Sequence, residues 1–350
     1  MKRKLNIVAS ALMMTAFICV PVLSGCSKTE NTSTETTTEK AAEQSEAASK
    51  DSASETEKEA EKGKLKVMAS FYPMYDFAVK IGGDKAEVMD MVPAGTEPHD
   101  WEPAATDIKN LEEADLFVYS GAGMEHWVDT VLASLENKEL VAVEASEGIT
   151  LRPGHEEEEE QEEAGSEQGE EDDHDHGQYD PHVWLSPLNA KKEMENIKDA
   201  FIKADPDNQS YYEANYTEYA AKFDQLDQEY KDTLSGLPNK NIVVAHEAFG
   251  YLCDAYGLNQ VGIEGLSPDS EPDPAKMAEV IDFVRENHVK VIFFEELVSP
   301  KVAETIASET GASAEMLNPL EGLSDEELAA GADYFSVMES NLEQLKAALE

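Results

Sequence analysis

The chain has 350 residues, of which 74 are acidic and 27 basic, and its formal net charge at pH 7 is -47. Such a charge repels nucleic acids and anionic lipid surfaces, so we expect no nucleic-acid partner. With 41% hydrophobic residues, the chain can bury the core of one large or two medium domains.

Residues 1–25 have the pattern of a secretory signal peptide. Basic residues 2–4 precede a mostly apolar run over 5–23, and the run closes with Leu-Ser-Gly-Cys. This ending resembles the bacterial lipobox, so we expect Cys26 to be lipidated and to anchor an extracytoplasmic protein to the cell membrane. An uncleaved anchor is the alternative, because ~20 apolar residues can span a bilayer.

Residues 26–64 contain Ser, Thr, Glu, Ala and Lys, and no aromatic or large aliphatic residue between 27 and 64. Such a segment buries too little apolar surface to offset the entropy of ordering, which predicts a disordered tether. Of the other two cysteines, Cys19 lies in the signal peptide. Cys253 is therefore without a disulfide partner, and we interpret it as a buried small hydrophobe.

Strands and helices alternate along residues 65–204, which predicts an α/β lobe with a mostly parallel sheet. The expected strands are 64–70, 86–92, 116–121 and 140–144, and the expected helices are 73–82, 104–113, 125–136 and 187–203. A loop over 154–178 interrupts this lobe. It is strongly acidic and contains His155, His174 and His176, so we expect it to collect metal ions beside the folded body; a solvated acidic spacer is the simpler alternative.

Residues 205–235 predict one long helix, because 208–234 contains no Gly or Pro and its aromatic residues recur at three- and four-residue steps. At 1.5 Å per residue this helix would be ~40 Å long and could link two lobes rigidly. Alternation resumes over 236–350, which predicts a second α/β lobe. Its expected strands are 241–246, 258–265, 290–296 and 314–318, and its expected helices are 247–256, 274–287, 300–311 and 333–349.

Three of the eight histidines are expected at strand ends, where parallel sheets bind ligands. His99 follows the strand 86–92, and His246 ends the strand 241–246. His182 lies beyond the acidic loop and shares with His99 the pattern Pro-His-x-Trp. A preceding proline and a nearby tryptophan limit ligand freedom and water access, which suits a metal site in the cleft between the lobes. The spacing alone is compatible with ordinary polar residues, since no close-spaced motif such as His-Glu-x-x-His is present.

A resemblance to a known family adds to this interpretation. It rests on SFYPMYDFAVKIGGD (70–84), VPAGTEPHDWEP (92–103), DPHVWLSP (180–187), AHEAFGYL (245–252) and LNPLEGL (317–323). These segments resemble the zinc-binding lipoproteins of bacterial ABC importers, within the metal-specific solute-binding family. The resemblance covers residues 65–350 and implies two (β/α) lobes joined by a long helix, with His99, His182 and His246 as ligands of one metal ion in the cleft.

The fourth ligand is less well defined. Glu321 matches the final acidic ligand loop of the family, while Glu295, Glu296 or water remain alternatives. Three imidazoles and one carboxylate suit tetrahedral Zn²⁺, whereas Mn²⁺ prefers more oxygen ligands. In the family, manganese-specific members replace one histidine by a carboxylate, and this sequence retains all three.

The resulting hypothesis is a monomeric, lipid-anchored protein that binds Zn(II) outside the cell as its transported ligand and delivers it to an ABC permease. No nucleophile–base pair or phosphate loop indicates an enzyme. Three alternatives remain: a manganese-binding homologue, a surface adhesin, and a zinc hydrolase with Glu247 or Glu97 as base.

Overall fold

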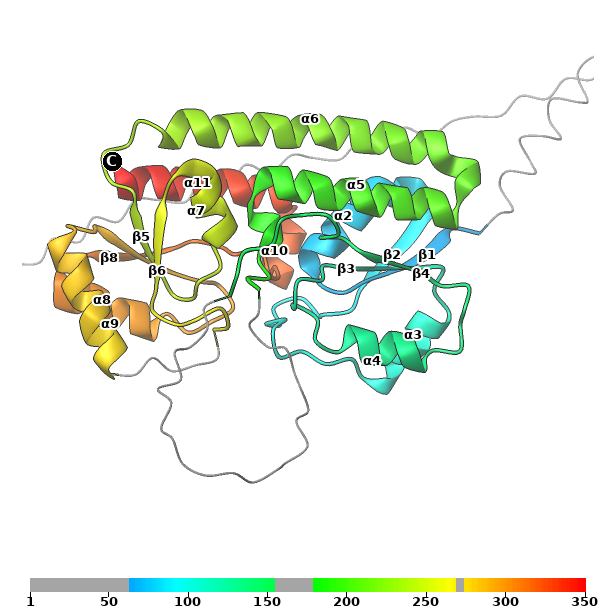
Figure 1. The fold of residues 1–350 in the computed structure, drawn as a ribbon, viewed down its shortest axis with the longest axis horizontal. Coiled ribbons are helices and arrows are strands. Elements are labelled where there is room, and N and C mark those ends of the chain that lie inside the picture. Colours follow the sequence, from blue (N-terminus) through cyan, green and yellow to red (C-terminus); the bar gives the residue numbers. More distant parts are fainter. Residues whose placement is uncertain (1–62, 155–178, 269–273) are drawn as a thin grey trace, which may run out of the picture. The chain divides into compact units, whose positions relative to one another are not determined.

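The computed structural model describes residues 63–154, 179–268 and 274–350 (Figure 1). The expected signal peptide, the tether up to residue 62 and residues 155–178 of the acidic loop lie outside the described residues, and so do Cys26, His155, His174 and His176. Within the part of the chain that the structure describes, no helix has both the length and the apolar character needed to cross a bilayer.

The first lobe contains a four-stranded sheet in the order β2-β1-β3-β4, with every neighbouring pair parallel. Its strands are β1 (Leu65–Ala69), β2 (Ala86–Asp90), β3 (Leu116–Tyr119) and β4 (Val141–Glu144). The helices that follow them are α2 (Tyr72–Gly82), α3 (Ala105–Glu112), α4 (Val128–Ser134) and α5 (Pro187–Ala204). Of the two central strands, β3 has no charged residue and β1 has one, the exposed Lys66, as expected of a parallel sheet with helices on both faces.

The second lobe repeats this arrangement in the order β6-β5-β7-β8, again entirely parallel. Its strands are β5 (Asn241–Val244), β6 (Asn259–Gly262), β7 (Val291–Phe294) and β8 (Ser313–Met316). Its helices are α7 (Gly250–Tyr256), α8 (Pro274–Glu286), α9 (Lys301–Thr310), α10 (Asp325–Ala330) and α11 (Tyr334–Leu349). The two sheets have the same strand order, which confirms the predicted α/β class with two lobes.

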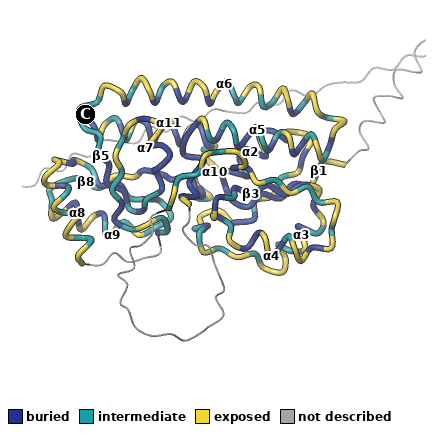
Figure 2. Tube along the Cα trace, in the orientation of Figure 1, coloured by how far each residue is buried: buried dark blue, intermediate teal, exposed yellow. Residues whose placement is uncertain are grey.

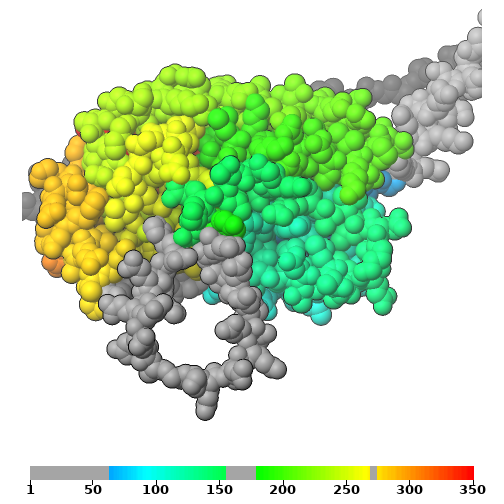
Figure 3. Space-filling view, in the orientation of Figure 1, coloured from blue at the N-terminus to red at the C-terminus, as the bar shows by residue number. Residues whose placement is uncertain are grey.

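Helix α6 (Gln209–Leu234) has 26 residues and leads from the first lobe into the second. It lies along α5 and also contacts α2, α7 and α11, so it touches elements of both lobes (Figures 1 and 3). Its buried face contains Tyr212, Phe223, Leu226 and Tyr230, while the opposite face is exposed (Figure 2). The predicted aromatic stripe is therefore a packing surface.

Helix α11 ends the chain but begins against the first lobe. Tyr334 packs edge-on against Phe77 of α2 and Phe223 of α6, with ring centroids 5.1 and 5.4 Å apart. Close by, Lys80 of α2 forms ion pairs with Asp76 at 2.6 Å and with Asp333 at 3.0 Å. A continuous apolar core consequently joins residues of both lobes beneath α6.

Most expected elements are present, with shorter limits. The helix expected from 247 begins at Gly250, and the strand expected over 258–265 is limited to 259–262. Helix α10 was not predicted; Ser324 and Glu327 form a capping box at its start.

Cys253 is buried, which raises the pKa of its thiol and agrees with the interpretation as a small hydrophobe. The predicted division of the chain into a tether, two lobes and a linking helix, with the boundaries given above, stays a prediction.

Candidate metal centre

Four side chains from distant parts of the sequence meet at the carboxyl ends of the two sheets. His99 lies in the loop after β2, and His182 precedes a short 3-10 turn (Val183–Leu185) that leads into α5. His246 follows β5, and Glu321 follows β8. Together they form the one group in the described residues with at least three potential metal ligands, and their ligand atoms lie within 4.8 Å of one another.

Five of the six separations between the four ligand atoms are close to those of a tetrahedral site. Nε2 of His182 lies 3.3 Å from Nε2 of His99 and 3.2 Å from Nε2 of His246. Oε1 of Glu321 lies 3.2, 2.9 and 3.1 Å from Nε2 of His99, His182 and His246. Ligands placed ~2.0–2.1 Å from a tetrahedral zinc ion are themselves about 3.3 Å apart, so these separations fit such an ion.

Burial isolates this group from solvent. His182 and His246 are fully buried and Glu321 is 2% exposed, while the side chain of His99 is 10% exposed. A buried carboxylate facing three imidazoles needs a positive charge between them, because uncompensated buried charge is costly. A bound cation or protons can supply that charge.

The electrostatics of the metal-free site follow from the same contacts. Burial alone would lower the pKa of His182, but Asp180 and Glu321 outweigh burial and raise it. Burial alone would also lower the pKa of His246, but Glu295 and Glu321 raise it well above its usual value. Burial would raise the pKa of Glu321, yet the neighbouring histidines hold it well below its usual range. In the metal-free site Glu321 is therefore ionised, and protonation of the histidines beside it balances its charge.

Two further carboxylates orient the histidines from behind. Oδ1 of Asp180 lies 2.9 Å from Nδ1 of His182 and accepts a hydrogen bond from its backbone N–H at 3.0 Å. Oε1 of Glu295 lies 2.6 Å from Nδ1 of His246. A proton on Nδ1 leaves Nε2 as the lone-pair atom, so each carboxylate favours the tautomer that can bind a metal.

Asp180 is itself fixed by Arg152 of the first lobe and by α7 of the second lobe. Its Oδ2 lies 3.3 Å from Nε of Arg152, and its backbone carbonyl accepts a hydrogen bond from the hydroxyl of Tyr251 at 2.9 Å. Arg152 also contacts Asp254 and donates to the carbonyl of Gly250 at 3.1 Å. A side chain at Gly250 would meet both Asp180 and Arg152, so this close approach requires glycine.

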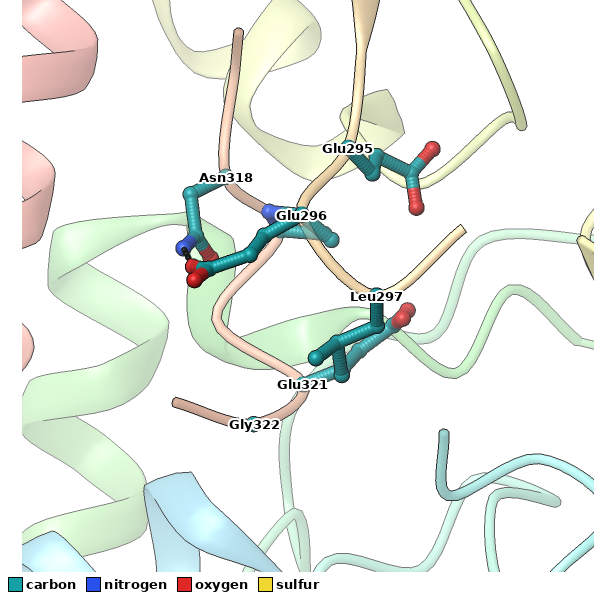
Figure 4. Close-up of a pocket in the computed structure, with 7 residues that line it drawn as sticks. Glu295, Glu296, Leu297, Asn318, Glu321 and Gly322 are labelled. Atoms are coloured by element: carbon teal, nitrogen blue, oxygen red, sulfur yellow. Dashed lines mark hydrogen bonds between the residues drawn. The ribbon is translucent and has the colours of Figure 1, made fainter. Parts of the chain in front are cut away.

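The geometry separates Glu321 from the alternative carboxylates. Figure 4 shows Glu295, Glu296 and Glu321 around one small pocket, with Glu296 directed toward Asn318. Nδ2 of Asn318 donates to Glu296 at 3.4 Å, while Glu295 contacts Nδ1 of His246 and not the shared Nε2 group. Of the three, Glu321 alone joins the Nε2 atoms of the histidines.

The two tryptophans of the Pro-His-x-Trp pattern differ in role. The ring of Trp184 lies 5.5 Å from that of His182 and is fully buried, as expected of an apolar wall. Trp101 instead makes its described ring contact with Trp127, at 5.7 Å. The predicted apolar wall is therefore confirmed beside His182.

The sequence did not identify Asp180 or Arg152 as residues of the site. It offered Glu295 as a possible metal ligand, but it did not predict the contact of Glu295 with His246. Asp180 stands two residues before His182 in Asp-Pro-His, and this proximity is a signal that could have identified it. The role of Arg152 depends on the packing of α7 against the first lobe, which local sequence does not reveal.

Known proteins resemble this chain over most of its described length. The family model for zinc-uptake complex component A, periplasmic (ZnuA) matches residues 67–348. The high-affinity zinc uptake system protein ZnuA of Bacillus subtilis is 49% identical over 286 residues, which cover 82% of this chain and 88% of that protein. The zinc-binding lipoprotein AdcA of Streptococcus pneumoniae is 42% identical over 290 residues, and the match spans 56% of its length.

Solved structures agree with these matches. The Zn(II)-bound ZnuA-like domain of S. pneumoniae AdcA has a TM-score of 0.70 and 40% identity, with 82% of this chain and 99% of that domain covered. The laminin-binding protein Lmb of Streptococcus agalactiae, titled a bifunctional protein with adhesin and metal transporting activity, has a TM-score of 0.71 and 33% identity; 82% of this chain and 100% of that one are covered. The chain belongs to the family of zinc-uptake complex component A proteins.

Proposed function

We propose that this chain is the zinc-binding component of an ABC importer, which captures Zn(II) outside the cytoplasm and delivers it to the permease. The observation that carries the proposal is the convergence of three imidazole nitrogens and one carboxylate oxygen on a single buried point. His99, His182, His246 and Glu321 would be the ligands. The zinc-uptake relatives support this assignment.

Zinc suits this donor set better than manganese does. Zn²⁺ accepts four ligands in a tetrahedron, and nitrogen atoms of histidine are among its usual ligands. Mn²⁺ prefers oxygen ligands and higher coordination numbers, which one carboxylate and three imidazoles do not supply. This site should therefore bind Mn²⁺ weakly, which makes a manganese-binding homologue the weaker alternative.

A zinc hydrolase is less compatible with the site. Catalytic zinc sites leave one coordination position open for water or substrate. Here Glu321 supplies the fourth ligand atom, and His182 and His246 are fully buried. We therefore propose a binding protein without enzymatic activity. Ester or peptide hydrolysis by the zinc-loaded protein that disappears in a His246→Ala variant would contradict this.

Adhesion is a second candidate because of one observation, the structural similarity to a laminin-binding protein described as bifunctional. Binding of this chain to immobilised laminin tests it. Binding that persists when His99, His182 and His246 are all replaced by Ala would indicate an adhesive surface separate from the metal site. Loss of laminin binding only after zinc removal would indicate that adhesion requires the metal-bound form.

The anchoring proposals rest on the sequence. We propose that Cys26 carries the lipid, that residues 26–64 are the tether to a monomeric body, and that His155, His174 and His176 form an accessory metal-collecting loop. Mass measurement of the membrane-bound protein tests the lipid on Cys26, and a Cys26→Ala variant should lack the added lipid mass.

Transport by cells tests the central proposal. A strain without this chain should take up ⁶⁵Zn slowly at nanomolar zinc, and the wild-type gene should restore uptake. A Glu321→Ala gene should not restore uptake, although its product is present at the normal level. Full restoration by a variant that lacks all four proposed ligands would overturn the proposal.

A further inference from the structure

The segment that carries Glu321, residues 317–323, adopts an unusual backbone conformation. Leu320 has a φ of 60°, a left-handed value that is rare for any residue with a Cβ atom. Leu320 is also fully buried and immediately precedes Glu321. Such a conformation persists only when surrounding contacts over-determine it, and it turns the chain so that Glu321 points toward the histidines.

Two buried asparagines provide those contacts. Asn341 of α11 is 3% exposed; its Oδ1 accepts a hydrogen bond from the N–H of Asn318 at 3.0 Å, and its Nδ2 donates to the carbonyl of Asn318 at 2.7 Å. Oδ1 of Asn318 in turn accepts a hydrogen bond from the N–H of Leu320 at 2.7 Å. Figure 4 shows Asn318 and Glu321 on this one segment.

The opposite side of the segment is fixed by the first lobe. Nε1 of Trp184 donates to the carbonyl of Pro319 at 2.8 Å, and the hydroxyl of Tyr334 donates to the carbonyl of Trp184 at 2.6 Å. Because Trp184 follows His182 by two residues, this bond ties the Glu321 segment directly to a histidine of the site. Asn341 completes the attachment from α11.

Packing does not explain an asparagine at position 341. Its neighbours on the buried face of α11 are Met338, Leu342 and Leu345, all apolar and buried. A buried amide costs free energy unless it is hydrogen-bonded, and an apolar residue would fill the position at no such cost. The amide is therefore better explained by its two bonds to Asn318.

We propose that Asn341 is a positioning residue for the metal site. Through Asn318 it holds Leu320 in the left-handed conformation and thereby aims the carboxylate of Glu321 at the three imidazoles. The inference rests on the proposed function, because it requires Glu321 to be a zinc ligand. It extends the site to the C-terminal helix, which contributes no ligand of its own.

The test is a double-mutant cycle between Asn341→Leu and Glu321→Ala. Zinc affinity is measured by competition with a chromophoric chelator, and the Tm of each metal-free protein is measured separately. Asn341→Leu alone should weaken zinc binding ~10–100-fold, as expected for loss of a residue that orients a ligand. In the Glu321→Ala background the same substitution should cause little further loss, because the carboxylate that it misplaces is already absent.

A matched control is Asn196→Leu. Asn196 of α5 also donates to backbone carbonyls, those of Ala145 and Glu147 at 2.8 and 2.9 Å, but these lie in the first lobe and away from residues 317–323. The Asn196→Leu variant should have a lower Tm than the wild type and the same zinc affinity. If Asn341→Leu does not fold, Asn341→Asp replaces it in the cycle, since Asp has the same size, keeps the acceptor for Asn318 N–H and places an oxygen in place of the donor to the Asn318 carbonyl.

The outcomes separate the two proposals. Unchanged zinc affinity in the Asn341 variant, or an equal loss with and without Glu321, would overturn the positioning role while the zinc site stands. A wild-type protein that does not bind zinc, or whose affinity is unaffected by Glu321→Ala, would overturn both.

Discussion

Nε2 of His182 lies 2.9 Å from Oε1 of Glu321, although 139 positions separate the two residues in the chain. His182 precedes the 3-10 turn that leads into α5, and Glu321 follows β8, the last strand of the second sheet in the chain. They meet because both lobes direct the carboxyl ends of their strands toward the same point. The closeness of this contact shows that the two lobes are closed around the site.

Removal of Asp180 should weaken the metal site without removing a ligand. In Asp180→Ala, Nδ1 of His182 loses its acceptor, so the imidazole is free to rotate and to change tautomer. We expect zinc affinity to fall ~10–100-fold, as measured by chelator competition. Asp254→Ala is the matched control, because it removes another acidic partner of Arg152 and contacts no histidine of the site. Equal affinities in the two variants would refute the orienting role.

The ion pairs of Lys80 should contribute strongly to stability. Lys80→Met leaves Asp76, which is 7% exposed, without its cation. Loss of one member of a buried ion pair costs about 3–5 kcal/mol, measured as the free energy of unfolding of the metal-free protein in urea. Lys191→Met breaks a similar but exposed pair with Asp224, at 2.6 Å, and should cost less than about 1 kcal/mol. Comparable losses in both variants would contradict this account.

Asp90 should make stability depend on pH. Burial raises its pKa from 3.8 to about 8. The folded state therefore retains a proton that the unfolded state releases, and wild-type stability falls as the pH rises from about 4 to about 8. Asp90→Asn removes this titration, so its stability relative to wild type should increase over that window, by at most about 1.4 kcal/mol per pH unit, and level off above it. Urea unfolding at pH 5, 7 and 9 measures the difference; a constant difference would disprove the assignment.

Deletion of residues 155–176 should preserve the tight zinc site. Pro153 and Tyr179 form an isolated antiparallel bridge, so the ends of the loop lie side by side and can be rejoined. We expect one tightly bound zinc ion to remain and weaker additional ions to be lost, as measured by equilibrium dialysis. A variant with Ala at positions 155, 174 and 176 separates the histidines from the acidic residues. Loss of the tight ion on deletion would make the loop the primary site.

The sequence predicted the alternation of strands and helices because several strands are short apolar runs between turn residues, as in β3 and β7. It also singled out His99, His182 and His246, which the structure brings together. His99 and His246 follow the strands β2 and β5 as expected, whereas His182 precedes a 3-10 turn and not a strand end. Helix α10 was missed although Ser324 and Glu327 form a capping signal, because its six residues carry too little periodicity.

The family resemblance favoured Glu321 as the fourth ligand, but the sequence left Glu295 and Glu296 open as alternatives. The choice among the three depends on the positive φ of Leu320 and on the hydrogen bonds of Asn318, which turn one carboxylate toward the histidines and another away. The contact of Glu295 with His246 joins two neighbouring strands of one sheet, β5 and β7. Side-chain direction in both cases is decided by tertiary packing.

Metal content, measured together with metal competition, tests whether this chain binds Zn(II) through His99, His182, His246 and Glu321. The protein is purified without added metal, its zinc is quantified by mass spectrometry, and Zn²⁺ and Mn²⁺ are then titrated in competition into the metal-free form. We expect one tightly bound zinc ion per chain that excess Mn²⁺ does not displace, and loss of that ion in His99→Ala and His182→Ala. Unchanged stoichiometry and affinity in both variants, or preferential binding of Mn²⁺, would contradict this expectation.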